Sequence, residues 1–498
     1  MSLVATESVT KMNKVLLIFT SLLVTIQSSS AVRQNTTDRL TLKDCQIQGV
    51  PGPAKCGTLK VYENHATKKG RMIDINLVVL GATGDKREPD PWVYFAGGPG
   101  SAATEDAQGI ADAFKKVREH RDLLFVDQRG TGKSHPLDCT FFNPDDLQSY
   151  LGYFFPIEDI RKCRPQLEAN ADLKLYTTDI AIDDMDEVRA ALGYEQLNLF
   201  GGSYGTRAAL TYLKRYPKRV RTATLQGVSP SNSYMPSDFP QGNERALQGV
   251  IAECRADEAC HNAFPNLPEE TKSLLAQLIK GPVEVEVRKQ NSNDRVKVKL
   301  TRDLAAEAIR YMLYNPVAAS RVPLTIHLAA QGNYAPLTES AIGYRKFLVG
   351  TGSNGMYLSV VCAEDLPWIK PGEGERMAAN TFLGDYRLRQ QREACALWPR
   401  ANIAKDYADP VRSDVPVLIL TGEWDPVTPP SNGDAVAKSL KNSLHIVVPH
   451  GAHGLGGLEN IDCVLGISTQ FVERGTTNGI DTACVKTVRR KGFALKAQ

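Results

Sequence analysis

A serine flanked by glycines is the first residue whose setting suggests chemistry. Ser203 lies in LNLFGGSYGTRAAL, residues 197–210, where an apolar segment typical of a strand meets a helical pattern. The residues match G-x-S-x-G, in which a serine occupies a strained turn between a strand and a helix. We expect Gly201, Gly202 and Gly205 to allow the close packing that such a turn needs. A serine hydroxyl is a poor nucleophile without a base and an acid that orients the base. The motif therefore predicts a carboxylate and a histidine further along the chain.

Two turns near the C-terminus carry these residue types. VLILTGEWDPVTPP places Asp425 just after an apolar strand, and LHIVVPHGAHG places His453 after the next one. We predict Asp425 as the acid because it lies deeper in its turn and precedes a proline. We predict His453 as the base because glycines flank its turn and let the loop reach Ser203. Glu423 is the alternative acid, and His450 is the alternative base.

Serine hydrolysis also needs N–H donors where negative charge develops on the substrate oxygen. The backbone N–H of Tyr204, directly after the serine, is one candidate. The segment AGGPG, residues 96–100, offers the N–H of Gly98 as the second, because Pro99 has no N–H to donate. These two amides form the predicted oxyanion hole.

The elements that must position these residues predict an α/β fold. From about residue 57 to 230, short apolar segments alternate with helical patterns, which is typical of a parallel sheet covered on both faces. Helical patterns follow, including residues 374–395, together with a β-hairpin formed by VEVEVRK and RVKVKL. Strand patterns resume near residue 413. We predict a core of residues 32–230 and 409–498, with a largely helical cap, 231–408, inserted before the last strands.

The N-terminus and the cysteines indicate export. Lys11 and Lys14 precede the apolar VLLIFTSLLVTI, and small residues up to Ala31 fit a cleavage site, so residues 1–31 predict a signal peptide. We therefore expect a secreted or periplasmic protein without membrane association once the signal is removed. An even count of ten cysteines favours disulfides in that compartment. Sequence neighbours suggest the pairs Cys45–Cys56, Cys139–Cys163, Cys254–Cys260, Cys362–Cys395 and Cys463–Cys484, although sequence alone leaves the pairing open.

Other classes of function find little support in the sequence. The net charge is +3, and lysines and arginines are scattered, so we expect no nucleic-acid partner. The basic C-terminal KTVRRKGFALK predicts a solvated last helix instead. The chain has no CxxC or HExxH, and we expect no metal and no cofactor. DQRGTGKS, residues 127–134, resembles a phosphate-binding loop, but Asp127 replaces its first glycine, and we interpret Asp127 and Arg129 as scaffold.

Five segments taken together carry a family resemblance. AGGPG, DQRGTGKS, GGSYGTRAAL, GEWDPVTP and PHGAHG, in this order, resemble the α/β-hydrolase serine exopeptidases. These include the proline iminopeptidases and, closer, the secreted tripeptidyl aminopeptidases with their TAP-like C-terminal segment. The resemblance covers most of the mature chain and implies the α/β-hydrolase fold. It also implies a triad of Ser203, Asp425 and His453, an oxyanion hole near Gly98 and Tyr204, and a cap that narrows access to peptide N-termini.

The resemblance has one departure and one consequence for substrate binding. Iminopeptidases usually carry a histidine before GGPG, where this chain has Ala96, which weakens the expectation of strict N-terminal proline specificity. In such enzymes an acidic cap residue commonly holds the substrate amino group, because burying an ammonium without a counter-charge is costly. Glu364 and Asp365 in VVCAEDLPW are the candidates. The alternative is a solvated acidic pair at a helix end.

These observations predict a serine aminopeptidase that acts on peptides. It would release short peptides or single residues from peptide N-termini through an acyl-enzyme. An esterase or other small acyl hydrolase is the first alternative, because the same triad cleaves esters. A non-catalytic binding protein that kept the fold is the second.

Overall fold

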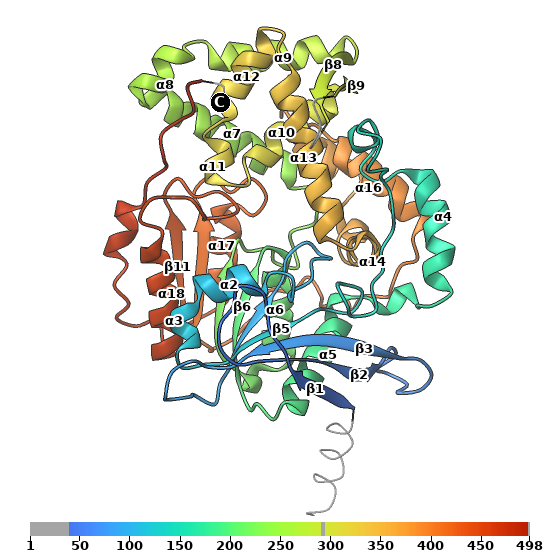
Figure 1. The fold of residues 1–498 in the computed structure, drawn as a ribbon, viewed down its shortest axis with the longest axis vertical. Coiled ribbons are helices and arrows are strands. Elements are labelled where there is room, and N and C mark those ends of the chain that lie inside the picture. Colours follow the sequence, from blue (N-terminus) through green and yellow to red (C-terminus); the bar gives the residue numbers. More distant parts are fainter. Residues whose placement is uncertain (1–38, 290–293, 497–498) are drawn as a thin grey trace, which may run out of the picture.

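The computed structural model describes residues 39–289 and 294–496, and a nine-stranded sheet forms its centre (Figure 1). The predicted signal peptide, residues 1–31, lies outside the described residues. The strands, in their order across the sheet, are β1 Leu40–Asp44, β2 Ala54–Tyr62, β3 Met72–Leu80, β5 Leu123–Val126, β4 Trp92–Phe95, β6 Leu197–Gly202, β7 Val220–Gln226, β10 Val417–Gly422 and β11 Ser443–Val448. The first three pairings are antiparallel. From β5 to β11 all are parallel, which confirms the predicted mostly parallel sheet.

Helices cover both faces of this sheet. Alternate side chains of a strand point to opposite faces, so Val93 and Phe95 of β4 join one apolar cluster while Trp92 and Tyr94 join the other. One face packs against α5 Thr178–Ala191, α6 Tyr204–Arg215 and α17 Pro430–Ala437. The other packs against α2 Ala107–Ala113, α3 Lys115–Arg118 and α18 Asp462–Arg474. This three-layer arrangement leaves the carboxyl ends of the parallel strands free to carry functional turns.

A second, mostly helical body lies over that end of the sheet (Figure 1). Its elements between β7 and β10 are α7 Phe239–Ala256, α8 Glu258–Ala263, α9 Leu267–Ile279, the antiparallel pair β8 Val283–Arg288 and β9 Arg295–Leu300, α10 Arg302–Met312, α11 Pro316–Ala319, α12 Val322–Ala330, α13 Ala335–Thr351, α14 Asn354–Glu364, α15 Glu373–Ala378 and α16 Tyr386–Leu397. They share one apolar cluster, which residues 137–176 and α4 Ile157–Glu168 also join. The boundaries at 231 and 408 stay predictions.

Short 3-10 helices complete the described secondary structure. They are η1 Ser149–Leu151, η2 Leu173–Leu175, η3 Pro217–Arg219, η4 Leu366–Trp368 and η5 Ala483–Thr487. In the described ranges 39–289 and 294–496, no helix has the length and apolar character that crossing a membrane requires.

Two expectations about helices are wrong. The pattern over residues 374–395 gives two helices, α15 and α16, because Asn380 and Gly384 take φ values of 60° and 70° between them. Such left-handed residues end a right-handed helix. The C-terminal basic segment forms no helix beyond Lys486 and Thr487, the last residues of the 3-10 helix η5, among the residues described up to 496. It runs from the sheet to the cap (Figure 1), where the partly buried Arg490 donates to Glu253 of α7 at 2.8 Å.

The cysteine pairing follows the sequence prediction. The structure contains the disulfides Cys45–Cys56, Cys139–Cys163, Cys254–Cys260, Cys362–Cys395 and Cys463–Cys484. Each closes a short loop, with sequence separations between 6 and 33 residues. The predicted disulfides are therefore confirmed, and no cysteine is left free.

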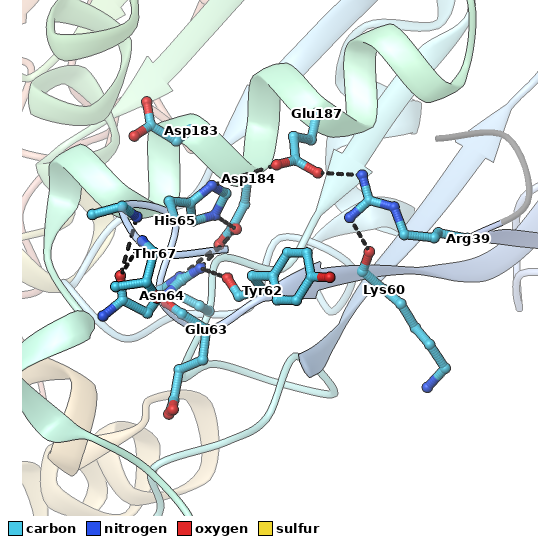
Figure 2. Close-up of polar contacts among 12 residues, drawn as sticks. Arg39, Lys60, Tyr62, Glu63, Asn64, His65, Thr67, Asp183, Asp184 and Glu187 are labelled. Carbon is cyan, nitrogen blue, oxygen red and sulfur yellow. Dashed lines mark hydrogen bonds and ion pairs between the residues drawn. The ribbon is translucent and has the colours of Figure 1, made fainter. Parts of the chain in front are cut away.

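The segment DQRGTGKS is a structural support, as interpreted. The fully buried Arg129 donates to both carboxylate oxygens of Asp184 on α5, at 2.6 and 2.8 Å. Figure 2 shows the outer part of the same network, in which His65 lies 2.6 Å from Asp184 and Arg39 donates to Glu187 at 2.8 Å. These contacts join α5 to three other segments: Arg129 follows β5, His65 follows β2, and Arg39 precedes β1.

Candidate active site

Ser203 occupies the sharp turn that its motif predicts. It follows β6, precedes the first residue of α6, and has φ 56° and ψ −125°. A non-glycine residue in such a conformation costs roughly 1–3 kcal/mol, a cost often found at functional sites. A methyl group on Gly201 would overlap the backbone of Gly205, and one on Gly205 would overlap the carbonyl oxygen of Phe95. Gly202 has open space instead, so the prediction of close packing is wrong for that glycine.

The structure brings Asp425 and His453 together. Asp425, fully buried after β10, accepts backbone N–H groups of Val427 at 2.9 Å and Thr428 at 2.8 Å on Oδ1. Its Oδ2 lies 2.9 Å from Nδ1 of His453, which follows β11. This contact fixes the imidazole so that Nδ1 faces the carboxylate and Nε2 remains for another partner, as a general base requires.

Thr428 is a residue that the sequence interpretation missed. Its hydroxyl donates to Asp425 Oδ2 at 2.7 Å and lies 3.0 Å from His453 Nδ1. The signal was present in DPVT, because a hydroxyl residue three positions after an aspartate can fold back onto its carboxylate in a tight turn.

The alternative acid and base contact each other and not the pair above. Glu423 accepts the backbone N–H of His450 at 2.9 Å, and His450 Nδ1 lies 2.7 Å from Glu253. The three side chains are close enough to hold a metal ion. However, Glu253 also accepts from Trp424 at 2.6 Å and from Arg490 at 2.8 Å. Burial alone would raise the pKa of Glu253, but His450 and Arg490 hold it below its ordinary value. The carboxylate is therefore satisfied by donors of the chain itself.

Ser203 and His453 both line a cavity of about 440 Å³. Gly98 lines the same cavity, and its neighbour Gly97 packs so closely that a methyl group there would lie 3.2 Å from Cβ of Ser203. Tyr204 is the first residue of α6, a position whose N–H has no partner within the helix. Tyr204 therefore follows Ser203 in the chain, and Gly98 lines the same cavity as Ser203. Their role as an oxyanion hole stays a prediction.

Glu364 and Asp365 do not reach this cavity. Both are completely buried and are absent from its lining. Glu364 accepts the N–H of Thr178 at 2.6 Å and its hydroxyl at 2.7 Å. Asp365 lies 2.9 Å from Nη1 of Arg207 in a fully buried ion pair. Neither the assignment to a substrate amino group nor the alternative of a solvated acidic pair agrees with this burial, because both carboxylates are enclosed by partners of the chain.

The comparisons with known proteins agree with this geometry. The family described as the alpha/beta hydrolase fold matches residues 91–456. The chain belongs to that family. This α/β hydrolase is 25% identical over 471 residues to the serine protease Hip1 of Mycobacterium tuberculosis, covering 87% of this chain and 88% of Hip1. It is 23% identical over 471 residues to the tripeptidyl aminopeptidase of Streptomyces lividans, covering 89% and 86% of the two chains. The predicted fold and family resemblance are confirmed.

A shorter match relates this chain to a proline iminopeptidase, a member of the other group that its sequence motifs resemble. It is 27% identical over 140 residues to the proline iminopeptidase of Neisseria gonorrhoeae, covering 28% of this chain and 32% of that protein. The likeness to the first two relatives extends over most of both chains, whereas the likeness to the iminopeptidase is local.

Proposed function

We propose that this α/β hydrolase is an exported serine aminopeptidase. It releases short peptides or single residues from peptide N-termini through an acyl-enzyme. The observation that supports this most directly is the contact between Asp425 and His453, made beside a cavity that Ser203 and His453 both line. The named activities of the two long relatives, a serine protease and a tripeptidyl aminopeptidase, support a peptide substrate.

In the proposed mechanism, Ser203 Oγ attacks the scissile carbonyl carbon while His453 Nε2 accepts the hydroxyl proton. Asp425 keeps Nδ1 of the imidazole protonated and stabilises the imidazolium that forms. The amides of Gly98 and Tyr204 donate to the oxyanion. His453 then returns the proton to the leaving amine, and a water molecule hydrolyses the acyl-enzyme by the same steps in reverse order.

An aminopeptidase must also recognise a free amino group. Three carboxylates line the cavity, those of Glu105, Asp106 and Asp238. Asp106 accepts the hydroxyl of Tyr94 at 3.1 Å, and Asp238 accepts that of Ser233 at 2.6 Å. Glu105 is exposed and makes no hydrogen bond to another described residue. We therefore propose these three, rather than Glu364 and Asp365, as the source of the counter-charge for the ammonium.

Export is proposed from the sequence and the disulfides together. Residues 1–31 have the features of a signal peptide. All ten cysteines are paired, a state that persists in oxidising compartments and is rare in the cytosol. Cell fractionation with an antibody to the natural chain, followed by N-terminal sequencing of the mature protein, tests both the location and the cleavage after Ala31.

Hydrolysis of a fluorogenic panel tests the activity itself. The panel contains aminoacyl, dipeptidyl and tripeptidyl amides, each free and N-acetylated, together with simple acyl esters. We expect cleavage of free amides only, lost in Ser203→Ala and retained in Ser101→Ala, which removes another serine hydroxyl from the same cavity. Ester turnover that depends on Ser203, without amide cleavage, would make the protein an esterase. Failure of a fluorophosphonate to label Ser203 would indicate the non-catalytic alternative.

A further inference from the structure

Three arginines and one glutamate are buried together in the cap. Glu307 and Arg310 come from α10, Arg345 from α13 and Arg387 from α16, and their exposed fractions are 1%, 2%, 2% and 5%. Glu307 lies 2.9 Å from Nη1 of Arg310 and 3.7 Å from Nη1 of Arg387. Tyr386 also donates its hydroxyl to Glu307. One carboxylate therefore balances three guanidinium groups.

The excess positive charge has few partners in the described part of the chain. Nε of Arg310, Nε and Nη1 of Arg345, and Nη1 of Arg387 are buried without a hydrogen-bond acceptor among the described residues. Another buried acid, Asp365, pairs with Arg207 instead. Burying an uncompensated charge is expensive, so such an excess needs a reason.

The pKa shifts of Glu307 and Arg345 agree with an excess of positive charge in the cluster. Burial alone would raise the pKa of Glu307, but Arg310, Arg387 and Arg345 hold it below its ordinary value. Burial, together with repulsion from Arg387 and Arg310, lowers the pKa of Arg345 to about 10 in spite of Glu307. Arg345 therefore remains charged near neutral pH, and a second anion beside the cluster would be stabilised.

Two of the three arginines face the cavity that contains Ser203. Arg310 and Arg387 both line it. The guanidinium of Arg387 stacks 3.5 Å from the ring centre of Phe154. Arg310 donates to the hydroxyl of Tyr314, whose ring lies 5.2 Å from that of His453. Tyr314 therefore contacts both Arg310 and the predicted catalytic base, His453.

We propose that Arg310 and Arg387 form a subsite for a carboxylate of the substrate. This inference rests on the proposed function and adds a specificity to it. The carboxylate belongs either to an acidic side chain of the substrate or to the terminal α-carboxylate of a short peptide. Glu105, Asp106 and Asp238 lie on other elements of the same cavity, before α2 and α7. The cavity therefore offers a negative group to an ammonium and a positive group to a carboxylate.

Paired substrates test the subsite and distinguish the two sources. Fluorogenic tripeptidyl amides that differ only in Glu or Gln at one position measure the side-chain source. Neutral tetrapeptides with a free or an amidated C-terminus measure the terminal source. A hydrogen-bonded charge pair would make the carboxylate member of one pair better in kcat/KM by about tenfold to a hundredfold. We expect Arg387→Met to abolish this preference and Arg387→Lys to retain part of it.

Arg389→Met is the matched control. Arg389 lies on the same helix, pairs with Asp385 at 3.0 Å and is absent from the cavity lining, so this variant should keep the full preference. The proposal is overturned if, in the wild type, kcat/KM of the two substrates in each pair differs by no more than about twofold. Such a ratio is smaller than one hydrogen-bonded charge pair would produce. It is also overturned if the preference survives in Arg387→Met.

A binding measurement separates this proposal from the proposed function. Calorimetry of the wild type and of Ser203→Ala with glutarate, and with uncharged glutaramide, needs no turnover and no arginine variant. Binding of glutarate but not of glutaramide supports the subsite even if no amide is cleaved, or if Arg387→Met does not fold. Equal binding of the two compounds, or binding of neither, rejects the subsite even in an active peptidase.

Discussion

Replacement of Thr428 by valine removes one hydroxyl from the predicted acid and base pair while preserving the shape of the side chain. The hydroxyl donates to Asp425 Oδ2 at 2.7 Å and lies 3.0 Å from His453 Nδ1. In Thr428→Val, Oδ2 keeps its contact with His453, and Oδ1 keeps both backbone N–H donors. The carboxylate therefore stays in place but loses one of its charge-assisted donors.

The size of the effect follows from that single bond. A hydrogen bond to a charged group contributes about 1.5–3 kcal/mol, and each 1.4 kcal/mol corresponds to about tenfold in rate. We expect kcat/KM of Thr428→Val to fall by about tenfold to a hundredfold, because the orientation of the Asp425 carboxylate toward His453 then depends on one fewer hydrogen bond. Labelling of Ser203 by a fluorophosphonate should slow by a similar factor, and it requires no knowledge of the natural substrate.

Two controls isolate the role of the hydroxyl. Thr428→Ser keeps the hydroxyl and loses only a methyl group, so its rate should stay close to that of the wild type. Thermal unfolding of both variants shows whether the buried site tolerates the change. A folded Thr428→Val protein that reacts as fast as the wild type would refute the reasoning, because the hydroxyl would then contribute nothing beyond the contact between Asp425 and His453.

Three further predictions concern packing, acid stability and metal dependence. Gly205→Ala should destabilise the fold by about 1–3 kcal/mol or more, because its methyl group would overlap the carbonyl oxygen of Phe95. Gly202→Ala, with open space at that position, should unfold near the wild-type temperature; equal losses would contradict the packing argument. Folding lowers the pKa of Glu307 below its ordinary value of 4.5. Ionised Glu307 therefore stabilises the folded state above pH 4.5, and this stabilisation is lost as the pH falls through the pKa of Glu307 in the folded protein. The difference in Tm between wild type and Glu307→Gln should therefore shrink from pH 7 to pH 3, and a constant difference would show that ionisation of Glu307 contributes no stability. Finally, EDTA should leave amide hydrolysis unchanged, since Ser203 and its partners supply the proposed nucleophile, and inhibition by the chelator would count against that scheme.

The sequence by itself determined features that depend on neighbours along the chain. The alternation of short apolar segments with helical patterns predicted the parallel part of the sheet, because strand and helix periods are local properties. The same locality explains why Ser203, Asp425 and His453 could be proposed together, because all three follow the carboxyl ends of strands that meet at one edge of the sheet. The sequence left the cysteine pairing open, and the pairing of sequence neighbours that it suggested is the one found, in which each disulfide closes a short loop.

Tertiary structure decided everything that depends on the direction of a side chain or on a distant partner. Glu364 and Asp365 have the right residue type, yet both carboxylates are buried among partners such as Thr178 and Arg207, away from the cavity. No periodicity distinguishes an acidic residue that faces a pocket from one that faces a buried arginine. The helix predicted over 374–395 breaks because Asn380 and Gly384 are left-handed, a conformation that asparagine and glycine adopt more readily than other residues.

The grouping of Arg310, Arg345 and Arg387 is the clearest case. Each of these arginines, taken alone, is expected on a solvated face. Only the packing of α10, α13 and α16 against one another buries all three around Glu307 and turns two of them toward the cavity. The sequence thus determined the fold and the order of the candidate catalytic residues, whereas long-range packing decided which charged side chains line the cavity.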